Sequence, residues 1–147
     1  MSDAENTTIP VFYDGPIIRV PCWEAAWDEF LADYMELPHE WGVADCVHFA
    51  MNNVGVLIGA DLTSKHLRQY ETQLGAYKYL KKIGYPSIAD LVSSFLPEVP
   101  IGMVQRGDIV LFEDCTGVCY GAVSLFMGEA GFERVATPVC TKAWKVG

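Results

Sequence analysis

Apolar side chains recur every three or four residues in the first two thirds of the chain, and this spacing predicts helices. The first predicted helix runs from Cys22 to Glu36, and Pro38 ends it. Its apolar positions form one face and comprise Trp23, Ala26, Trp27, Phe30, Leu31 and Tyr34. This face predicts core packing, with a carbohydrate or peptide platform as the alternative.

Further helical segments follow the first one. A second helix is predicted from about Cys46 to Ile58, with Gly59 as its C-terminal stop. Residues 60–75 are expected to be a polar connection, with a helical turn or more over 61–70. Two short helices are predicted after it, over 76–83 and 88–95, and Ser87 is expected to cap the second of them.

After Pro100 the apolar pattern changes to a period of two, which indicates strands. The predicted elements, in order, are a strand over 109–112, a turn over 113–117, a strand over 118–127, a hairpin loop over 128–131 and a strand over 132–137. Residues 138–146 are expected to return across the surface, anchored by Trp144. Helices followed by an antiparallel sheet predict an α+β fold.

The length and composition are those of one globular domain. The chain has 147 residues, of which 51% are hydrophobic and 20% charged. Residues 1–21 contain three prolines and predict an irregular N-terminal arm with room for one short strand over 17–20. The domain itself is predicted over 22–147. No apolar run is long enough to span a bilayer, and the polar, acidic N-terminus predicts no signal peptide.

Charge and cysteine content restrict the kinds of partner and site. The net charge of −9 leaves no basic stripe for phosphates, so we expect no nucleic-acid partner. Five widely spaced cysteines do not resemble a disulfide framework, and reduced thiols are expected. Cys115 and Cys119 resemble half of a metal site, but no second ligand pair follows at zinc-like spacing. We therefore predict neither a metal nor another cofactor.

The stretch from Trp41 to Ala50 is the best candidate for chemistry. Gly42 predicts a turn, Asp45 has the side chain of a helix cap, and Cys46 then opens an apolar helix. A thiol at a helix N-terminus lies where the macrodipole favours thiolate, which is one way to prepare a nucleophile. Asp45 is expected to cap the helix, with tuning of the thiol as its second role. The alternative for Cys46 is an ordinary buried thiol.

These pieces together resemble a family. An aromatic-Gly turn, Asp45-Cys46 at a helix start, and Arg106-Gly107-Asp108 before an antiparallel meander are similar to NlpC/P60-type papain-like cysteine peptidases. The similarity covers about 20–146 and is greatest to the short branch found in tailed-phage and prophage tail gene clusters. It implies a papain-like fold with N-terminal helices packed on a small antiparallel sheet.

The resemblance also implies a catalytic set, which this sequence does not complete. The family uses a cysteine nucleophile, matched by Cys46, and a histidine at the start of the second sheet strand. That histidine position falls on Ala122, and its orienting partner would fall near 134–135, where no residue matches. His48 is two residues from the nucleophile, so on a helix the two cannot face each other. His39 is a candidate substitute base, and His66 is unplaced.

Three functions remain open at this stage. The first is a phage-tail peptidase that cuts peptidoglycan peptides through Cys46, assisted by Asp45 and His39. The second is an inactive, structural tail-tip protein that binds neighbouring tail or baseplate proteins. The third is a thiol-dependent amide or acyl enzyme acting on another substrate. The first two place the protein in the virion tail after synthesis in the host cytoplasm.

Overall fold

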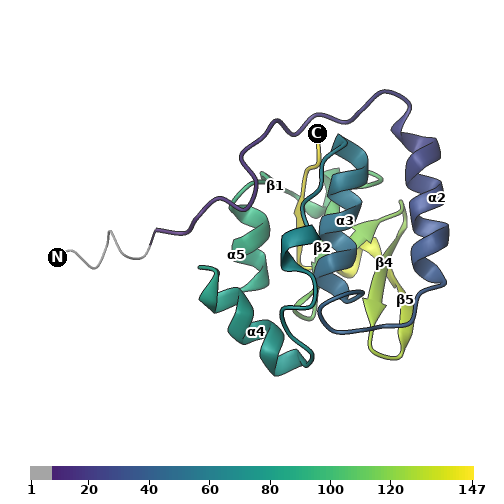
Figure 1. Cartoon of the computed structure of the whole chain (residues 1–147). Coiled ribbons are helices and arrows are strands. Elements are labelled where there is room, and N and C mark those ends of the chain that lie inside the picture. The colour runs from purple at the N-terminus through teal and green to yellow at the C-terminus, as the bar shows by residue number, and fades with distance from the viewer. Residues whose placement is uncertain (1–7) are drawn as a thin grey trace.

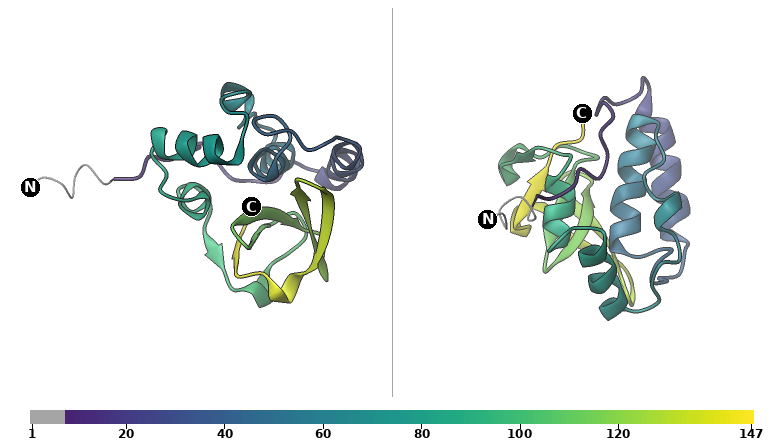
Figure 2. Two further views of the ribbon diagram at one scale, coloured as in Figure 1. Left: turned by 90° about the horizontal axis from the view of Figure 1, so that it is seen from below. Right: turned by 60° about the vertical axis from the view of Figure 1, so that its left-hand side comes forward.

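The computed structural model describes residues 8–147, so the first seven residues of the predicted arm lie outside the described part. Within 8–147 the fold is α+β, with four α-helices and one six-stranded antiparallel sheet (Figure 1). Viewed from below, the helices form one layer and the curved sheet the other (Figure 2). No helix of the described part combines the length and apolar character needed to cross a membrane.

The helices follow the predicted apolar spacing. Their bounds are α2 Trp23–Met35, α3 Cys46–Ile58, α4 Gln73–Lys82 and α5 Ile88–Ser93. The Ser87 side chain caps α5 as predicted, and Gly59, with a φ of 72°, ends α3. The polar connection contains a single 3₁₀ turn, η1 Ser64–His66.

The strand order in the sheet is β1-β6-β2-β3-β4-β5. The strands are β1 Glu98–Val99, β2 Ile109–Phe112, β3 Cys115–Cys119, β4 Val123–Gly128, β5 Gly131–Ala136 and β6 Lys142–Trp144. Strand β2 and the hairpin between β4 and β5 agree with the sequence predictions. The shortest strand, β1, was not predicted, because two residues carry no detectable period.

The predicted strand over 118–127 is wrong, because two strands occupy this region. A tight turn at Gly121 and Ala122 separates β3 from β4, and the amide of Tyr120 donates to the carbonyl of Val123 across it. Gly121 has a φ of 125°, which favours glycine. The predicted turn over 113–117 is likewise too long. Only Glu113 and Asp114, both with positive φ, connect β2 to β3.

The C-terminal segment is the largest departure from prediction. Instead of returning across the surface, 142–144 form β6 and enter the sheet between β1 and β2. Trp144 is an anchor as predicted, but it is fully buried, and its indole donates to Ser93 Oγ. The residues around this tryptophan are short and polar or small, so they show no strand periodicity. The pairing of this segment is decided by strands that are distant in sequence.

The described part of the N-terminal arm, from residue 8 on, contacts the domain. The strand expected over 17–20 is absent, and Val20 instead donates one backbone hydrogen bond to Leu57 at the end of α3. Arg19 contacts Asp108 at 3.0 Å and also donates to the carbonyl of Val146. Buried Asp108 in turn accepts the amide of Val146, so the predicted turn at 106–108 joins the arm to the C-terminus.

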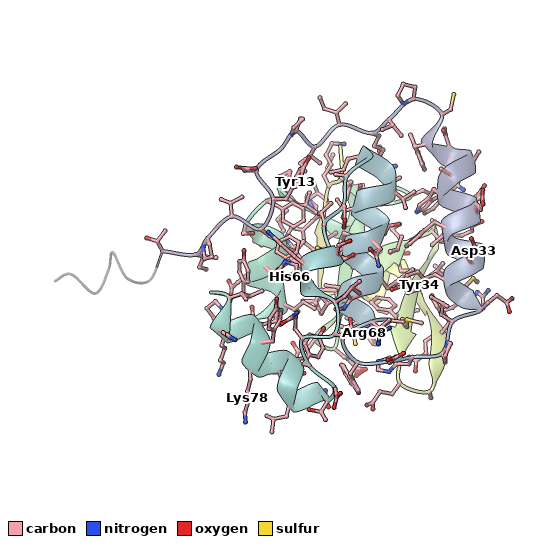
Figure 3. The ribbon with its side chains drawn as sticks, in the orientation of Figure 1. Tyr13, Asp33, Tyr34, His66, Arg68 and Lys78 are labelled. Carbon is pink, nitrogen blue, oxygen red and sulfur yellow. The ribbon has the colours of Figure 1, made fainter. Side chains whose placement is uncertain are left out.

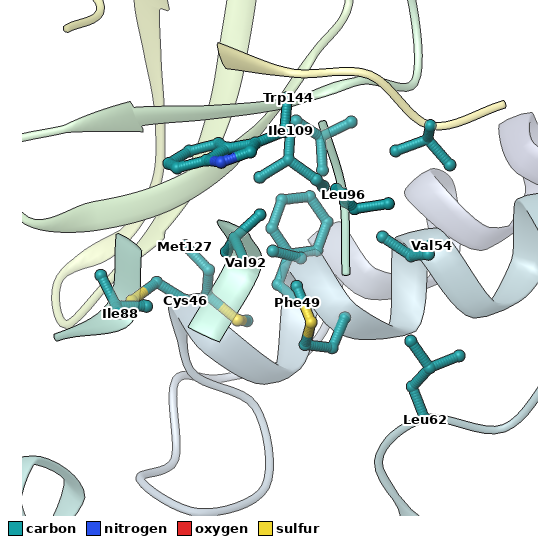
Figure 4. Close-up of a cluster of buried hydrophobic side chains, with 14 of the residues drawn as sticks. Cys46, Phe49, Val54, Leu62, Ile88, Val92, Leu96, Ile109, Met127 and Trp144 are labelled. Atoms are coloured by element: carbon teal, nitrogen blue, oxygen red, sulfur yellow. The ribbon is translucent and has the colours of Figure 1, made fainter. Parts of the chain in front are cut away.

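The core lies between α3 and the sheet. Side chains from α3, α5 and four strands meet there, including Cys46, Phe49, Val54, Val92, Ile109, Met127 and Trp144 (Figure 4). Buried Trp27 of α2 donates its indole hydrogen to Asn53 of α3 at 2.7 Å. The predicted role of the tryptophan face in core packing is therefore confirmed for Trp27. This packing sets α3, and the turn before it, against β3.

Candidate functional site

The turn that leads into α3 requires glycine at one position. Glu40 and Ala44 form an isolated bridge, and Gly42 between them has a φ of 82°. A Cβ on Gly42 would lie 2.3 Å from the carbonyl oxygen of Tyr70. The left-handed backbone and this close approach both exclude a side chain. The backbone of this turn therefore packs directly against the segment that precedes α4.

Asp45 is the hydrogen-bonding centre of the site and is fully buried. Its Oδ1 accepts the amide of His48 at 2.9 Å, which confirms the predicted helix cap, and also faces His48 Nδ1 at 2.8 Å. Its Oδ2 accepts the amide of Gly42 at 2.9 Å and the hydroxyl of Tyr70 at 2.6 Å. One carboxylate thus joins the entry turn, α3 and the segment before α4.

The electrostatics of this cluster favour an ionised Asp45. Burial raises the pKa of Asp45, but the hydrogen bonds and charge of His48, with the hydroxyl of Tyr70, outweigh burial and hold it below its ordinary value of 3.8. Burial, and then the charge of Asp45, raise the pKa of Tyr70. Tyr70 therefore stays a neutral donor to the carboxylate.

None of the three histidines is positioned as a base for Cys46. His48 is buried, with Nδ1 2.8 Å from Asp45 Oδ1 and Nε2 3.3 Å from the carbonyl oxygen of His66. His39 packs edge-on against Trp41, with ring centroids 4.6 Å apart. Among the hydrogen bonds of residues 8–147, none joins the Cys46 thiol to any histidine.

His66 belongs to a separate cluster. It comes, like Arg68, from the segment between α3 and α4 (Figure 3). Its Nδ1 forms a hydrogen bond of 2.6 Å with the hydroxyl of Tyr79, and its ring stacks on Phe12 of the arm. Its Nε2 is buried without a partner among the described residues. His66 lines a cavity of about 20 Å³, which is close to the volume of one water probe.

Cys46 is the first residue of α3 and faces the sheet. The hydroxyl of Thr116 on β3 donates to the Cys46 carbonyl at 3.0 Å. The thiol of Cys46 interacts with that of Cys115, the first residue of β3. Only 9% of Cys46 is exposed, and both cysteines border a pocket of about 70 Å³ that Glu113 and Asp114 also line.

The two thiols have opposite acidities. The hydrogen bond to Cys115 and burial raise the pKa of Cys46 well above its ordinary value. The same hydrogen bond lowers the pKa of Cys115, although burial and nearby carboxylates oppose this. These directions make Cys46 the hydrogen-bond donor of the pair and Cys115 the more acidic of the two thiols. The predicted thiolate at Cys46 is therefore not favoured, because pairing and burial outweigh the helix dipole.

The expected histidine position, Ala122, lies directly before β4 in the structure. The sequence comparison placed it at Ala122, which lies in the turn after β3. The strand that follows 106–108 and β2 is β3, and its first residue is Cys115. In the register of the sheet, Phe112 pairs with Cys115 at one end of β3, and Ala122 lies beyond the other end. Cys115 therefore opens the strand beside β2, whereas Ala122 lies in the turn between β3 and β4.

Sequence reasoning missed the pairing of Cys46 with Cys115. Recognising 113–114 as a two-residue hairpin turn would have placed Cys115 at a strand start. The possible metal pair is a different matter: Cys115 and Cys119 lie at opposite ends of β3, roughly 13 Å apart at the usual strand rise, which is too far for a shared ion. Residues 8–147 contain no group of three or more His, Cys, Asp or Glu suited to a metal.

Comparison with known proteins identifies a family but no individual relative. The model of a domain of unknown function, DUF6950, matches residues 18–146, from within the arm to the penultimate residue. No curated protein and no solved structure matches the chain. Since the match spans most of the sequence, the chain belongs to the DUF6950 family.

Proposed function

We propose that this chain is a papain-like, NlpC/P60-type domain that no longer hydrolyses amides and acts as a structural component of a phage tail tip. The fold assignment is supported by Asp45-Cys46 opening the central helix and by the turn at 106–108 preceding the antiparallel meander. The tail location rests on the sequence resemblance alone.

One observation carries the loss of hydrolysis: the Cys46 thiol faces Cys115 rather than an imidazole. Amide cleavage needs a group that takes the thiol proton and returns it to the leaving amine, and such help is worth roughly 10²–10⁴-fold. The nucleophile itself keeps its proton, because burial and the hydrogen bond raise its pKa.

The shape of the site supports the same conclusion. Pockets that bind small ligands usually measure about 300–1,000 Å³. The pocket beside Cys46 measures about 70 Å³, and the thiol at its base is nine-tenths buried. A peptide carbonyl cannot reach the sulfur without displacing side chains of the core. Cys46 here resembles a packing residue (Figure 4).

A digestion assay tests the chemical half of the proposal. Purified peptidoglycan is incubated with the wild type, Cys46→Ala and the exposed-thiol control Cys22→Ser, and released muropeptides are measured by mass spectrometry. We expect no release above a buffer blank from any of the three. Release by the wild type and Cys22→Ser that Cys46→Ala abolishes would show an active peptidase and overturn the proposal.

Immunogold labelling of purified virions tests the location. We expect label at the tail tip in particles made with either the wild type or Cys46→Ala, because assembly does not need the thiol. Absence of the protein from purified virions would overturn the tail assignment and leave the conclusion on hydrolysis intact. Failure of Cys46→Ala to assemble, despite wild-type thermal stability, would overturn a purely structural role for the domain.

A further inference from the structure

We propose that Cys46 and Cys115 form a reversible disulfide and that this pair is a modification site for small, cationic disulfides. This inference does not depend on the proposed tail function. It rests on two thiols that the fold brings together from distant parts of the sequence, at the start of α3 and the start of β3. Both border one small pocket.

The start of α3, which carries Cys46, and the start of β3, which carries Cys115, are joined by a hydrogen bond. Thr116, next to Cys115, donates its hydroxyl to the Cys46 carbonyl at 3.0 Å, and this bond is buried. The two cysteine side chains line the same pocket. A disulfide requires the sulfurs to approach to about 2.05 Å, with Cβ atoms about 3.5–4.5 Å apart. Because the two side chains already share one pocket, the sulfurs need only a local movement to reach this geometry.

The pair is asymmetric in exposure, as an attacking and a resolving thiol should be. Cys115 is partly exposed, whereas 9% of Cys46 is accessible. The hydrogen bond from Cys46 lowers the pKa of Cys115, so Cys115 has the greater thiolate character. An oxidant that enters the pocket therefore contacts Cys115 first, and the more buried Cys46 reacts after it.

The charge of the pocket selects among oxidants. The charged residues that line it are Glu113 and Asp114, and Glu133 also acts electrostatically on Cys115. These carboxylates repel an anionic disulfide and attract a cationic one, and this effect weakens as salt screens it. The chain's net charge of −9 acts in the same direction.

The exchange proceeds in two balanced steps. The Cys115 thiolate attacks one sulfur of the small disulfide, whose S–S bond breaks and releases one small thiolate, which takes a proton from water. Cys46 loses its proton to water and attacks the Cys115 sulfur of the mixed disulfide, releasing the second small thiolate. The protein is oxidised by two electrons, and one small disulfide is reduced to two thiols.

The other cysteines provide internal controls. Cys22 is exposed and forms the residue before α2, so it would react as an ordinary surface thiol and is replaced by serine. Cys119 and Cys140 pack in a second apolar cluster and are 1% and 5% exposed. With no accessible member, this buried pair should remain reduced.

The test uses full-length Cys22→Ser protein and cystamine as the cationic disulfide. We expect four free thiols before treatment and two after it, with a Cys46–Cys115 peptide in a non-reducing digest. Dithiodipropionate, an anionic disulfide of similar size, should react at least several-fold more slowly at low salt, and the difference should shrink in 0.5 M salt. Oxidation should also raise the thermal midpoint by several degrees, because the bond closes a loop of about 70 residues.

Variants separate the two roles. In the Cys22→Ser background, Cys46→Ser should stop at one cysteamine adduct on Cys115, and Cys115→Ser should slow the whole reaction at least tenfold. If either serine variant unfolds, the digest of the Cys22→Ser protein still decides the outcome. Retention of all four thiols, a first adduct on Cys46, or a Cys119–Cys140 bond formed first would overturn the proposal. Equal rates with the two disulfides at low salt would overturn the charge selection.

Discussion

Replacing Asp45 by asparagine should greatly destabilise the protein, although the two side chains are nearly the same size. The carboxylate accepts four hydrogen bonds, from Gly42, the amide and ring of His48, and Tyr70. An amide oxygen can keep the two bonds from His48. The amide NH₂ then faces the other two donors, and only Tyr70 can turn its hydroxyl to accept from it.

The loss in the free energy of unfolding follows from these contacts. The buried Gly42 amide loses its acceptor, at about 1–3 kcal/mol, and the two bonds from His48 lose the strength of a charged partner, at about 1 kcal/mol each. The total is about 3–5 kcal/mol, a large part of the 5–15 kcal/mol typical of a domain. With a urea m-value of about 2 kcal/mol/M, the midpoint should fall by about 2 M.

Urea unfolding, followed by tryptophan fluorescence at pH 7, measures this loss. Asp61→Asn is the matched control, because exposed Asp61 accepts two backbone amides, from Thr63 and Ser64, that an amide oxygen can still accept. Its midpoint should barely move. An Asp45→Asn midpoint within 0.3 M of the wild type would refute the assignment of Asp45 as the hydrogen-bonding centre.

The same substitution has a pH signature. The pKa of Asp45 is lower in the folded protein than its ordinary value of 3.8, so its contribution to stability is complete above that value and is lost as pH falls through the folded pKa. The stability difference between wild type and Asp45→Asn should therefore shrink between pH 5 and pH 2. A difference that stays constant over this range would show that the carboxylate has no special stabilisation.

Two other substitutions test the frame around the site. Asn53→Ala should cost about 2–4 kcal/mol, because it removes the acceptor of the Trp27 indole and the donor to the Gly107 carbonyl, both buried. Urea unfolding would show a lower midpoint with a similar m-value. Gly42→Ala should prevent the entry turn from closing, because its Cβ would lie 2.3 Å from the Tyr70 carbonyl at a φ that disfavours alanine. We expect a thermal midpoint lower by at least 5 °C in calorimetry.

Neighbouring positions supply the controls for these two substitutions. Asn52→Ala removes only partly buried contacts, to Tyr34 and Thr63, and should cost less than Asn53→Ala. Gly121→Ala also places an alanine at a positive φ, 125° against 82° at Gly42, but its Cβ would have no atom within 4 Å. If Gly121→Ala lowers the midpoint as much as Gly42→Ala, backbone strain rather than the close contact explains the effect.

Local chemistry determined much of the helical half of this protein. Apolar spacing located α2 and the bounds of α3, and Ser87 and Asp45 cap their helices through side-chain bonds to amides three residues ahead. These features depend on neighbours within one or two turns, which a single sequence displays. For the same reason the Gly42 turn and the Asp45-Cys46 helix start were visible before any fold was known.

The tertiary structure decided what lies opposite these local features. Three contacts join residues that are far apart in sequence. They are the contact of Cys115 with Cys46, the hydrogen bond from Tyr70 to Asp45, and the pairing of β6 with β2. Strand pairing and burial result from the whole packed arrangement and leave no local period to detect. The acidity of each thiol was settled in the same way, because a neighbouring sulfur and burial outweigh the helix dipole that the sequence alone reveals.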